Sequence, residues 1–189
     1  MGLTPGVEDV TRPLEIVPYD PQWPVAFEAE RRRLAAAFGE LAVRIEHNGS
    51  TAVPGLAAKP VIDIQVSARR LHPIERYAPA LERLGYVHLV HPDDAFAPFF
   101  HRPASWPHTH HVHVVQAGGE EERRTLAFRD YLRDHAEIAR EYEALKRRLA
   151  PGYIATTAGS QQAYADAKGE LIRAVTERAL VEGYPRVCE

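Results

Sequence analysis

The chain has 189 residues, of which 26 are acidic and 23 are lysine or arginine, so its formal net charge is -3 at pH 7. A slightly acidic chain has no global positive field, so we expect neither nucleic acid nor an anionic membrane as a partner. The length is sufficient for one substantial hydrophobic core. The single cysteine, Cys188, excludes an internal disulfide. No run approaches the ~18 apolar residues of a membrane span, and no secretory signal is visible, so we expect a cytoplasmic protein.

Helices and strands are predicted from the spacing of apolar residues. Apolar residues three and four positions apart indicate amphipathic helices, and strict alternation indicates half-buried strands. In chain order we expect an extended arm or strand at 14–17, a helix at 22–39, a strand at 43–47, a turn and helix start at 48–51, a strand at 61–66, a helix at 73–84, strands at 86–90, 99–102 and 111–115, and helices at 120–150 and 161–182. These elements predict one α/β domain over residues 14–182, mainly helical over 119–182, between a polar leader at 1–13 and a tail at 183–189.

A glycine-containing turn follows the strand predicted at 43–47. Gly49, Ser50 and Thr51 leave that strand and open a short helix. Backbone N–H groups at a helix start, together with two hydroxyl groups, suit a phosphate. The alternative is an ordinary helix cap without a ligand. Taken alone, the turn is compatible with both interpretations.

One acidic residue lies inside the most apolar predicted strand. Alternation places Asp63 and Gln65 on one face of this strand and its isoleucines on the other. Because burial of an unpaired carboxylate is costly, Asp63 needs a partner. A divalent cation is one such partner, since Mg²⁺ prefers carboxylate and phosphate oxygens and assists phosphoryl transfer. The alternative is that Asp63 caps a helix or pairs with an arginine or lysine.

Four histidines fall within residues 108–113. Alternation places His111 and His113 on one face of the predicted strand and His110 on the other. Two imidazoles at alternate positions of a strand can hold a metal ion or share a proton. The alternative is a pair of surface histidines. A histidine-triad hydrolase needs a third imidazole at the preceding alternate position, where this chain has Thr109.

Three further residues are candidate ligands for a nucleotide. Tyr164 and Lys168 are four positions apart on the predicted last helix, and Lys168 lies on its apolar stripe. A tyrosine can stack on a base and an ammonium can bind phosphate, although the same lysine can instead extend to solvent along the apolar stripe. Arg102, at the end of the strand predicted at 99–102, is a candidate second phosphate ligand.

Several blocks of sequence match a known family in the same order. They are residues 17–24, 45–64, 109–115 and 126–133, followed by Tyr164 and Lys168. Over about residues 14–180 the chain resembles the GrpB-like family, a branch of the nucleotidyltransferase superfamily. The resemblance implies a nucleotidyltransferase-like mixed sheet with flanking helices and a C-terminal helical extension. It also implies that Gly49 and Ser50 form a phosphate-binding turn and that Asp63 is the first metal-binding carboxylate.

The superfamily implies transfer of a nucleoside monophosphate from a nucleoside triphosphate to a hydroxyl with two divalent metals, here Mg²⁺ or Mn²⁺. This chain departs from that pattern, because Gln65 occupies the second carboxylate position and His111 and His113 stand where a third carboxylate is expected. Imidazole ligands favour Mn²⁺ or Zn²⁺ over Mg²⁺. We therefore expect Asp63, His111 and His113 to converge in one polar cleft. The predicted function is metal-dependent nucleotidyl transfer to a small molecule or protein; the alternative is a non-catalytic nucleotide- or metal-binding regulatory module.

Overall fold

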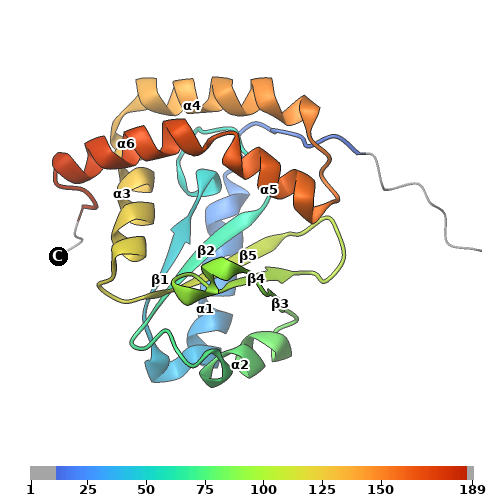
Figure 1. Cartoon of the computed structure of the whole chain (residues 1–189), viewed down its shortest axis with the longest axis vertical. Coiled ribbons are helices and arrows are strands. Elements are labelled where there is room, and N and C mark those ends of the chain that lie inside the picture. The colour runs from blue at the N-terminus through green and yellow to red at the C-terminus, as the bar shows by residue number, and fades with distance from the viewer. Residues whose placement is uncertain (1–11, 187–189) are drawn as a thin grey trace, which may run out of the picture.

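Five strands form one mixed sheet in the order β1-β2-β5-β4-β3 (Figure 1). The computed structural model describes residues 12–186, so residues 1–11 of the predicted leader and Cys188 lie outside the described residues. Only β2 and β5 are parallel neighbours, and the other pairs are antiparallel. The strands are β1 (Ala42–Asn48), β2 (Ile62–Ala68), β3 (Val87–Leu89), β4 (Phe99–Arg102) and β5 (His110–Gln116).

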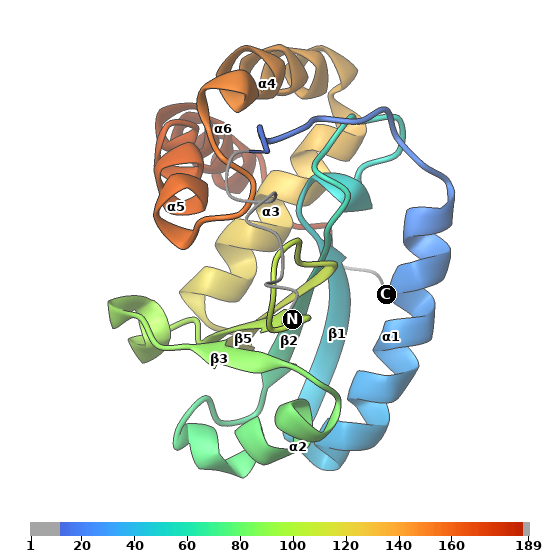
Figure 2. The ribbon, with the colours of Figure 1, turned by 90° about the vertical axis from the view of Figure 1, so that its right-hand side faces the viewer.

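Helices cover both faces of this sheet, which confirms the predicted α/β class. In Figure 2, α1 lies along one face and α3 along the other, while α4, α5 and α6 stack beyond α3. The helices are α1 (Gln22–Phe38), α2 (Ala78–Arg83), α3 (Glu120–Asp134), α4 (Ala136–Leu149), α5 (Ala158–Asp166) and α6 (Gly169–Val181). None of the helices within residues 12–186 is long and apolar enough to cross a membrane.

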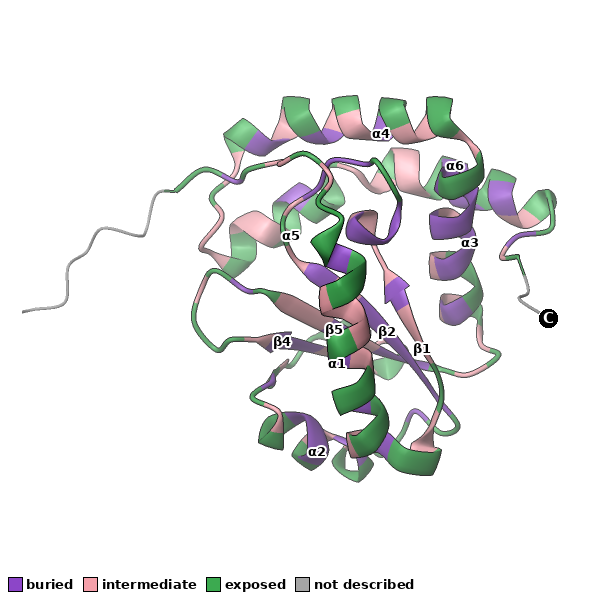
Figure 3. Cartoon of the chain, turned by 180° about the vertical axis from the view of Figure 1, so that it is seen from behind, coloured by how far each residue is buried: buried purple, intermediate pink, exposed green. Residues whose placement is uncertain are grey.

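The alternation in β2 gives each face of the sheet a different character. Ile62, Ile64 and Val66 are buried in a core with α1 and α2. Asp63 and Gln65 point to the opposite face, as the sequence predicts. A second core joins α3, α4 and α6, and β2 is largely buried while the outer sides of α1 and α4 are exposed (Figure 3).

The two long helices predicted in the C-terminal half are each interrupted. The predicted helix at 120–150 breaks at His135, whose φ of -123° and ψ of 82° are not helical. The break lets Tyr131 of α3 and Tyr142 of α4 enter the same core, so packing overrides local propensity. The predicted helix at 161–182 breaks before Lys168, which precedes α6 instead of lying within a continuous helix.

One of two shorter predictions also needs correction. The helix expected at 73–84 is a 3₁₀ turn (Ile74–Arg76) followed by the short α2. The segment at 14–17 is an extended arm, the first of its two predicted alternatives, and Val17 makes an isolated bridge to Ala58. This arm still crosses the C-terminal region, because Leu14 packs with Ala150 and Tyr164 in a third small core.

Candidate functional site

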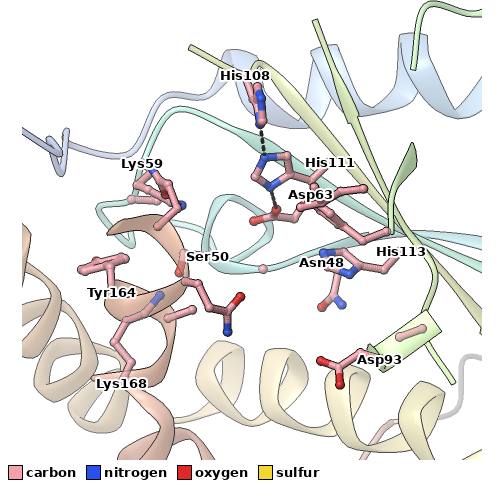
Figure 4. A pocket seen from close by; sticks show the side chains of 18 of the residues that line it. Asn48, Ser50, Lys59, Asp63, Asp93, His108, His111, His113, Tyr164 and Lys168 are labelled. Atoms are coloured by element: carbon pink, nitrogen blue, oxygen red, sulfur yellow. Dashed lines mark hydrogen bonds and ion pairs between the residues drawn. The ribbon is translucent and has the colours of Figure 1, made fainter. Parts of the chain in front are cut away.

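A cavity of about 490 Å³ lies between the α3 face of the sheet and α4, α5 and α6. Its volume is within the range of pockets that bind small molecules. Figure 4 shows Lys59, Tyr164 and Lys168 on one side, Asp93 on the other, and Asp63 with His111 between them. Of the residues predicted from sequence, those that line the cavity are Gly49, Ser50, Thr51, Asp63, His111, His113, Tyr164 and Lys168.

The parallel pairing of β2 with β5 places Asp63 beside His111. The two residues are register partners, and the imidazole Nδ1 lies 3.1 Å from the Asp63 carboxylate oxygen Oδ1. Burial raises the pKa of Asp63, but the hydrogen bond to His111 and the charges of His111, Lys59 and His113 outweigh it and lower the pKa to about 2. Asp63 is therefore an ionised carboxylate at neutral pH. Burial lowers the pKa of His113 to about 4, so this imidazole is neutral.

A third histidine, which the sequence did not single out, extends this pair. His108 Nδ1 lies 3.2 Å from His111 Nε2, so Asp63, His111 and His108 form a chain of hydrogen-bonding groups. The His108 ring is stacked between Trp106 and His101, at centroid distances of 3.6 and 3.9 Å. Burial, together with the charges of His101, His111 and Lys59, lowers the pKa of His108 to about 3. The chain thus contains an ionised carboxylate and, in His108, a neutral imidazole at its far end.

The turn after β1 requires glycine at position 49, because the Asp63 side chain lies against its Cα. Gly49 has φ of 66° and ψ of -170°, a region that side chains rarely adopt, and a Cβ there would overlap the Asp63 carboxylate. The next residues form a single 3₁₀ turn (Ser50–Ala52), so the expected helix start and its dipole are absent from this segment. Thr51 is buried and donates a hydrogen bond to the Val61 carbonyl at 3.2 Å, which fixes the turn against β2.

Every lysine of the sequence lines this cavity. Among the 23 lysines and arginines only Lys59, Lys146 and Lys168 are lysines, and none of the arginines lines the cavity. Lys59 Nζ donates to Gln161 Oε1 at 2.7 Å, and Lys146 Nζ donates to a backbone carbonyl, that of Ala57. Within residues 12–186, no lysine ammonium forms an ion pair with a carboxylate. The cavity therefore gathers three amino groups that are not ion-paired within this part of the chain.

Burial and mutual repulsion make these lysines unusually acidic. Burial and the charge of Lys59 lower the pKa of Lys168 to about 8. Burial and the charge of Lys168 lower the pKa of Lys146 to about 7, and burial also lowers the pKa of Lys59. A bound anion would oppose both causes, because it supplies a counter-charge in direct contact with the ammonium groups.

Tyr164 lies between two of these ammonium groups. Its ring centroid is 4.2 Å from Lys168 Nζ and 5.7 Å from Lys59 Nζ. Lys168 reaches the cavity from the turn between α5 and α6, where Ala167 and Lys168 keep right-handed helical φ and ψ angles. The pairing of Tyr164 with Lys168 was expected from their spacing. Lys59 and Lys146 were missed, since one lies in a loop and the other among exposed charges of α4.

Arg102 is the predicted residue that the structure does not bring to the cavity. In the antiparallel β4–β5 pair, Arg102 is the register partner of His110, which points to the α1 face. Its guanidinium lies 3.1 Å from Glu30 of α1 and contacts the His110 ring. The alternation that directs His111 toward the cavity therefore directs Arg102 away from it.

The family described as GrpB protein matches residues 13–178 of the chain. The chain belongs to the GrpB family. YqkA of Bacillus subtilis, a UPF0157 protein, is 35% identical over 168 residues, which are 89% of this chain and 48% of YqkA. The chain thus spans about half the length of this relative.

Two further relatives extend the match in fold and in sequence. The crystal structure of the conserved protein GrpB from Enterococcus faecalis is similar with a TM-score of 0.78 and 32% identity, covering 89% of this chain and 98% of that one. A dephospho-CoA kinase of Mycolicibacterium paratuberculosis is 33% identical over 159 residues, which are 71% of this chain and 39% of the kinase. The fold described above is therefore that of a GrpB protein.

The cavity of this GrpB-family chain does not form a metal centre built from protein ligands alone. Among the described residues, no group of three or more histidine, cysteine, aspartate and glutamate side chains is placed to hold a metal ion. The His111 Nδ1 atom faces Asp63 rather than open space. Gln65, at the position of the second carboxylate, is fully buried and its Oε1 accepts hydrogen bonds from Thr125 and Asn48. The arrangement instead joins a cationic side, suited to phosphates, to a carboxylate–imidazole chain suited to proton transfer.

Proposed function

We propose that the cavity binds a nucleoside triphosphate and transfers its nucleoside monophosphate to an acceptor hydroxyl, as in the nucleotidyltransferase superfamily. The observation that carries this proposal is the convergence of all three lysines on one cavity, with no ion-paired carboxylate among residues 12–186. An ammonium is a compact, hydrated charge that binds phosphate well, and its pKa shifts when it is buried. A cluster of such groups with lowered pKa values is typical of a functional site.

The lining of the cavity has a place for each part of a nucleotide. The lysines and the turn of Gly49 and Ser50 provide the phosphate side. Aromatic side chains provide flat surfaces on which a base can stack; they are Phe96, Phe99, Trp106, Phe128, Tyr142 and Tyr164. In Figure 4 Asp63 and His111 lie next to the lysine side. A triphosphate held by the lysines would therefore place its reacting phosphorus near this pair.

The chemical step requires a proton acceptor beside the acceptor hydroxyl. The hydroxyl oxygen attacks the α-phosphorus, a new P–O bond forms, the bond to the α,β-bridging oxygen breaks, and pyrophosphate leaves. The proton of the hydroxyl passes to the imidazole chain of His111 and His108. The ionised Asp63 orients His111 and stabilises the imidazolium that forms. The lysines neutralise the charge that accumulates on the departing pyrophosphate.

A divalent ion enters this proposal as part of the substrate. Mg²⁺ usually retains several waters and is held largely by substrate phosphates, so a nucleotide can carry it into a site without a dedicated protein cage. Mn²⁺ is the second ion to test, because imidazoles are close by.

The name of one relative is consistent with phosphate chemistry. The M. paratuberculosis protein is named dephospho-CoA kinase, and the matching segment occupies 39% of its length. A GrpB-like segment joined to an enzyme named for phosphoryl transfer supports a nucleotide or another phosphorylated molecule as the ligand. The match covers too little of the kinase to transfer its activity to this chain.

A second candidate function is a non-catalytic nucleotide-binding regulatory module. Gln65 favours this function, because a fully buried amide replaces the second carboxylate of catalytic members. Such a module would use the same lysines and the same turn. It would differ only in lacking turnover.

Two measurements on the same protein separate these functions. Isothermal titration with ATP, GTP, CTP and UTP, each with Mg²⁺ or Mn²⁺, measures binding. A pyrophosphate-release assay with a panel of hydroxyl compounds measures transfer. Transferase activity predicts both binding and release, whereas a regulatory module predicts binding alone. Absence of binding by every nucleotide would contradict both candidates.

A further inference from the structure

A second, smaller compartment adjoins the main cavity. It has a volume of about 140 Å³ and lies under the N-terminal arm. Five residues line both spaces and so form their common wall; they are Lys59, Trp106, His108, His111 and Gln161. The hydrogen bond from Lys59 to Gln161 lies within this wall. The far end of the Asp63–His111–His108 chain is therefore accessible from both spaces.

The small compartment is mainly apolar away from the common wall. Its remaining lining includes Leu14, Pro60, Val61, Pro107 and Ala155. The exceptions are Arg12 and Glu15, which pair with each other at 3.3 Å, and Thr156, whose hydroxyl is buried and has no hydrogen-bond partner among residues 12–186. Buried hydroxyl groups are normally hydrogen-bonded, so this orphan points to a ligand that carries a polar atom. An apolar cavity of ~150 Å³ holds benzene, which sets the size of that ligand at about one six-membered ring.

We infer that the small compartment is the acceptor site and that the acceptor is a compact, mainly apolar alcohol. This inference rests on the proposed function and names its second substrate class. The triphosphate occupies the lysine side, and the alcohol approaches the common wall from the other compartment. Its hydroxyl proton passes to the imidazoles while its oxygen forms the new bond to the α-phosphorus and pyrophosphate leaves. A proton acceptor in the common wall of the two compartments explains why His108 and His111 line both.

Benzyl alcohol, which combines one ring with one hydroxyl, is the probe of this site. Titration of benzyl alcohol into ¹⁵N-labelled protein should shift the amide signals of Val61, Ala155 and Thr156. The same shifts should appear when ATP and Mg²⁺ are already bound, because the two ligands occupy different spaces. Failure of these amides to respond in the wild-type protein would overturn the inference without any variant.

Two variants give reciprocal controls. Ala155→Phe fills the small compartment and should weaken benzyl alcohol binding at least about tenfold, with ATP affinity within about twofold of wild type. Lys168→Met should weaken ATP and leave benzyl alcohol affinity unchanged. Ala155→Leu is the milder replacement if Ala155→Phe lowers the melting temperature.

The outcomes separate this inference from the proposed function. Competition between benzyl alcohol and ATP, or an equal loss of both in Ala155→Phe, would overturn a separate acceptor site. If ATP fails to bind while benzyl alcohol still shifts the compartment amides, nucleotidyl transfer is overturned and the compartment stands as a small-molecule site. If ATP binds and the alcohol does not, only the acceptor site fails.

Discussion

The two faces of the sheet hold buried charges in different ways. On the α1 face, Glu30 accepts hydrogen bonds from Arg102 at 3.1 Å, from the Tyr86 hydroxyl at 3.0 Å and from Arg33 at 2.8 Å. Arg102 also contacts His110. Each charged group of this network therefore has an ion-pair partner within the protein.

The opposite face gathers cations that the described residues do not neutralise by direct pairing. In the part of the chain that the structure describes, no carboxylate forms an ion pair with Lys59, Lys146 or Lys168. Burial lowers the pKa of each of these lysines. Burial of unpaired charge costs stability, so a fold retains it where a ligand supplies the partner. We therefore propose that the α3 face binds an anion, whereas the paired charges of the α1 face stabilise the fold.

The largest expected effect concerns two neighbouring histidines on opposite faces. His111→Gln retains a hydrogen-bonding amide but removes the imidazole that takes up the proton. Pyrophosphate release should fall about 100- to 10,000-fold, the usual contribution of a general base. His110→Gln on the α1 face is the matched control and should retain release close to that of wild type. Equal losses in both variants would show that the two faces do not differ in function.

The next prediction concerns two glycines with positive φ. Gly49→Ala should lower the free energy of unfolding by ~1–3 kcal/mol through backbone strain alone, and further through overlap with Asp63. Gly55 has φ of 80°, but a Cβ at that position would meet no atom within 4 Å, so Gly55→Ala should show strain only. Chemical denaturation of both variants measures the difference. An equal loss in the two would mean that the contact between Gly49 and Asp63 is unimportant.

The next prediction compares two variants, each of which removes one cation from a different face of the sheet, and its expected effects are smaller. Lys168→Met should weaken nucleotide binding by ~1–3 kcal/mol, because a charge-assisted hydrogen bond to phosphate is lost. It should not lower the free energy of unfolding, since the removed charge has no ion-paired carboxylate among residues 12–186. Arg102→Met should show the reverse pattern, with unchanged nucleotide affinity and a loss of ~1–3 kcal/mol of stability through Glu30. Titration calorimetry and denaturation of both variants test this exchange of roles.

These variants probe residues that the sequence predicted with unequal success. Alternation in β2 and β5 was sufficient to place Asp63, His111 and His113 on one face, because a period of two is a local property of a strand. The same rule, applied to β4 with its register, would have removed Arg102 from the phosphate site. That register depends on strand pairing, which no local pattern in the sequence specifies.

The lysine cluster was the main omission. Lys168 was found from its four-residue spacing to Tyr164, and Lys59 and Lys146 were not found. The composition contained a clue to this cluster, because only three of the 23 lysines and arginines are lysines. Their convergence depends on how α4 and α6 fold back over the sheet, and the break at His135 has no proline or glycine to mark it.

The smallest predicted effect is a dependence of nucleotide affinity on pH. In the free cavity the pKa is about 7 for Lys146 and about 8 for Lys168, and a bound phosphate raises both. The protonated forms bind the anion, so affinity should be highest below these values and fall as pH rises from about 7 to about 9. Calorimetry in buffers of different ionisation enthalpy should detect proton uptake on binding near pH ~8, reduced in Lys168→Met. An affinity that stays flat over this range would contradict the assignment.

The three lysines are proposed to form an anion site, and because they are so few their pKa values can be measured directly. Protein labelled with ¹³C only at lysine gives three side-chain signals, which can be followed by NMR through a pH titration with and without ATP and Mg²⁺. We predict pKa values below the ordinary ~10.4 in the free protein and an upward shift of the pKa values of Lys59, Lys146 and Lys168 when the nucleotide binds. Three ordinary lysine titrations that ATP leaves unchanged would contradict this prediction.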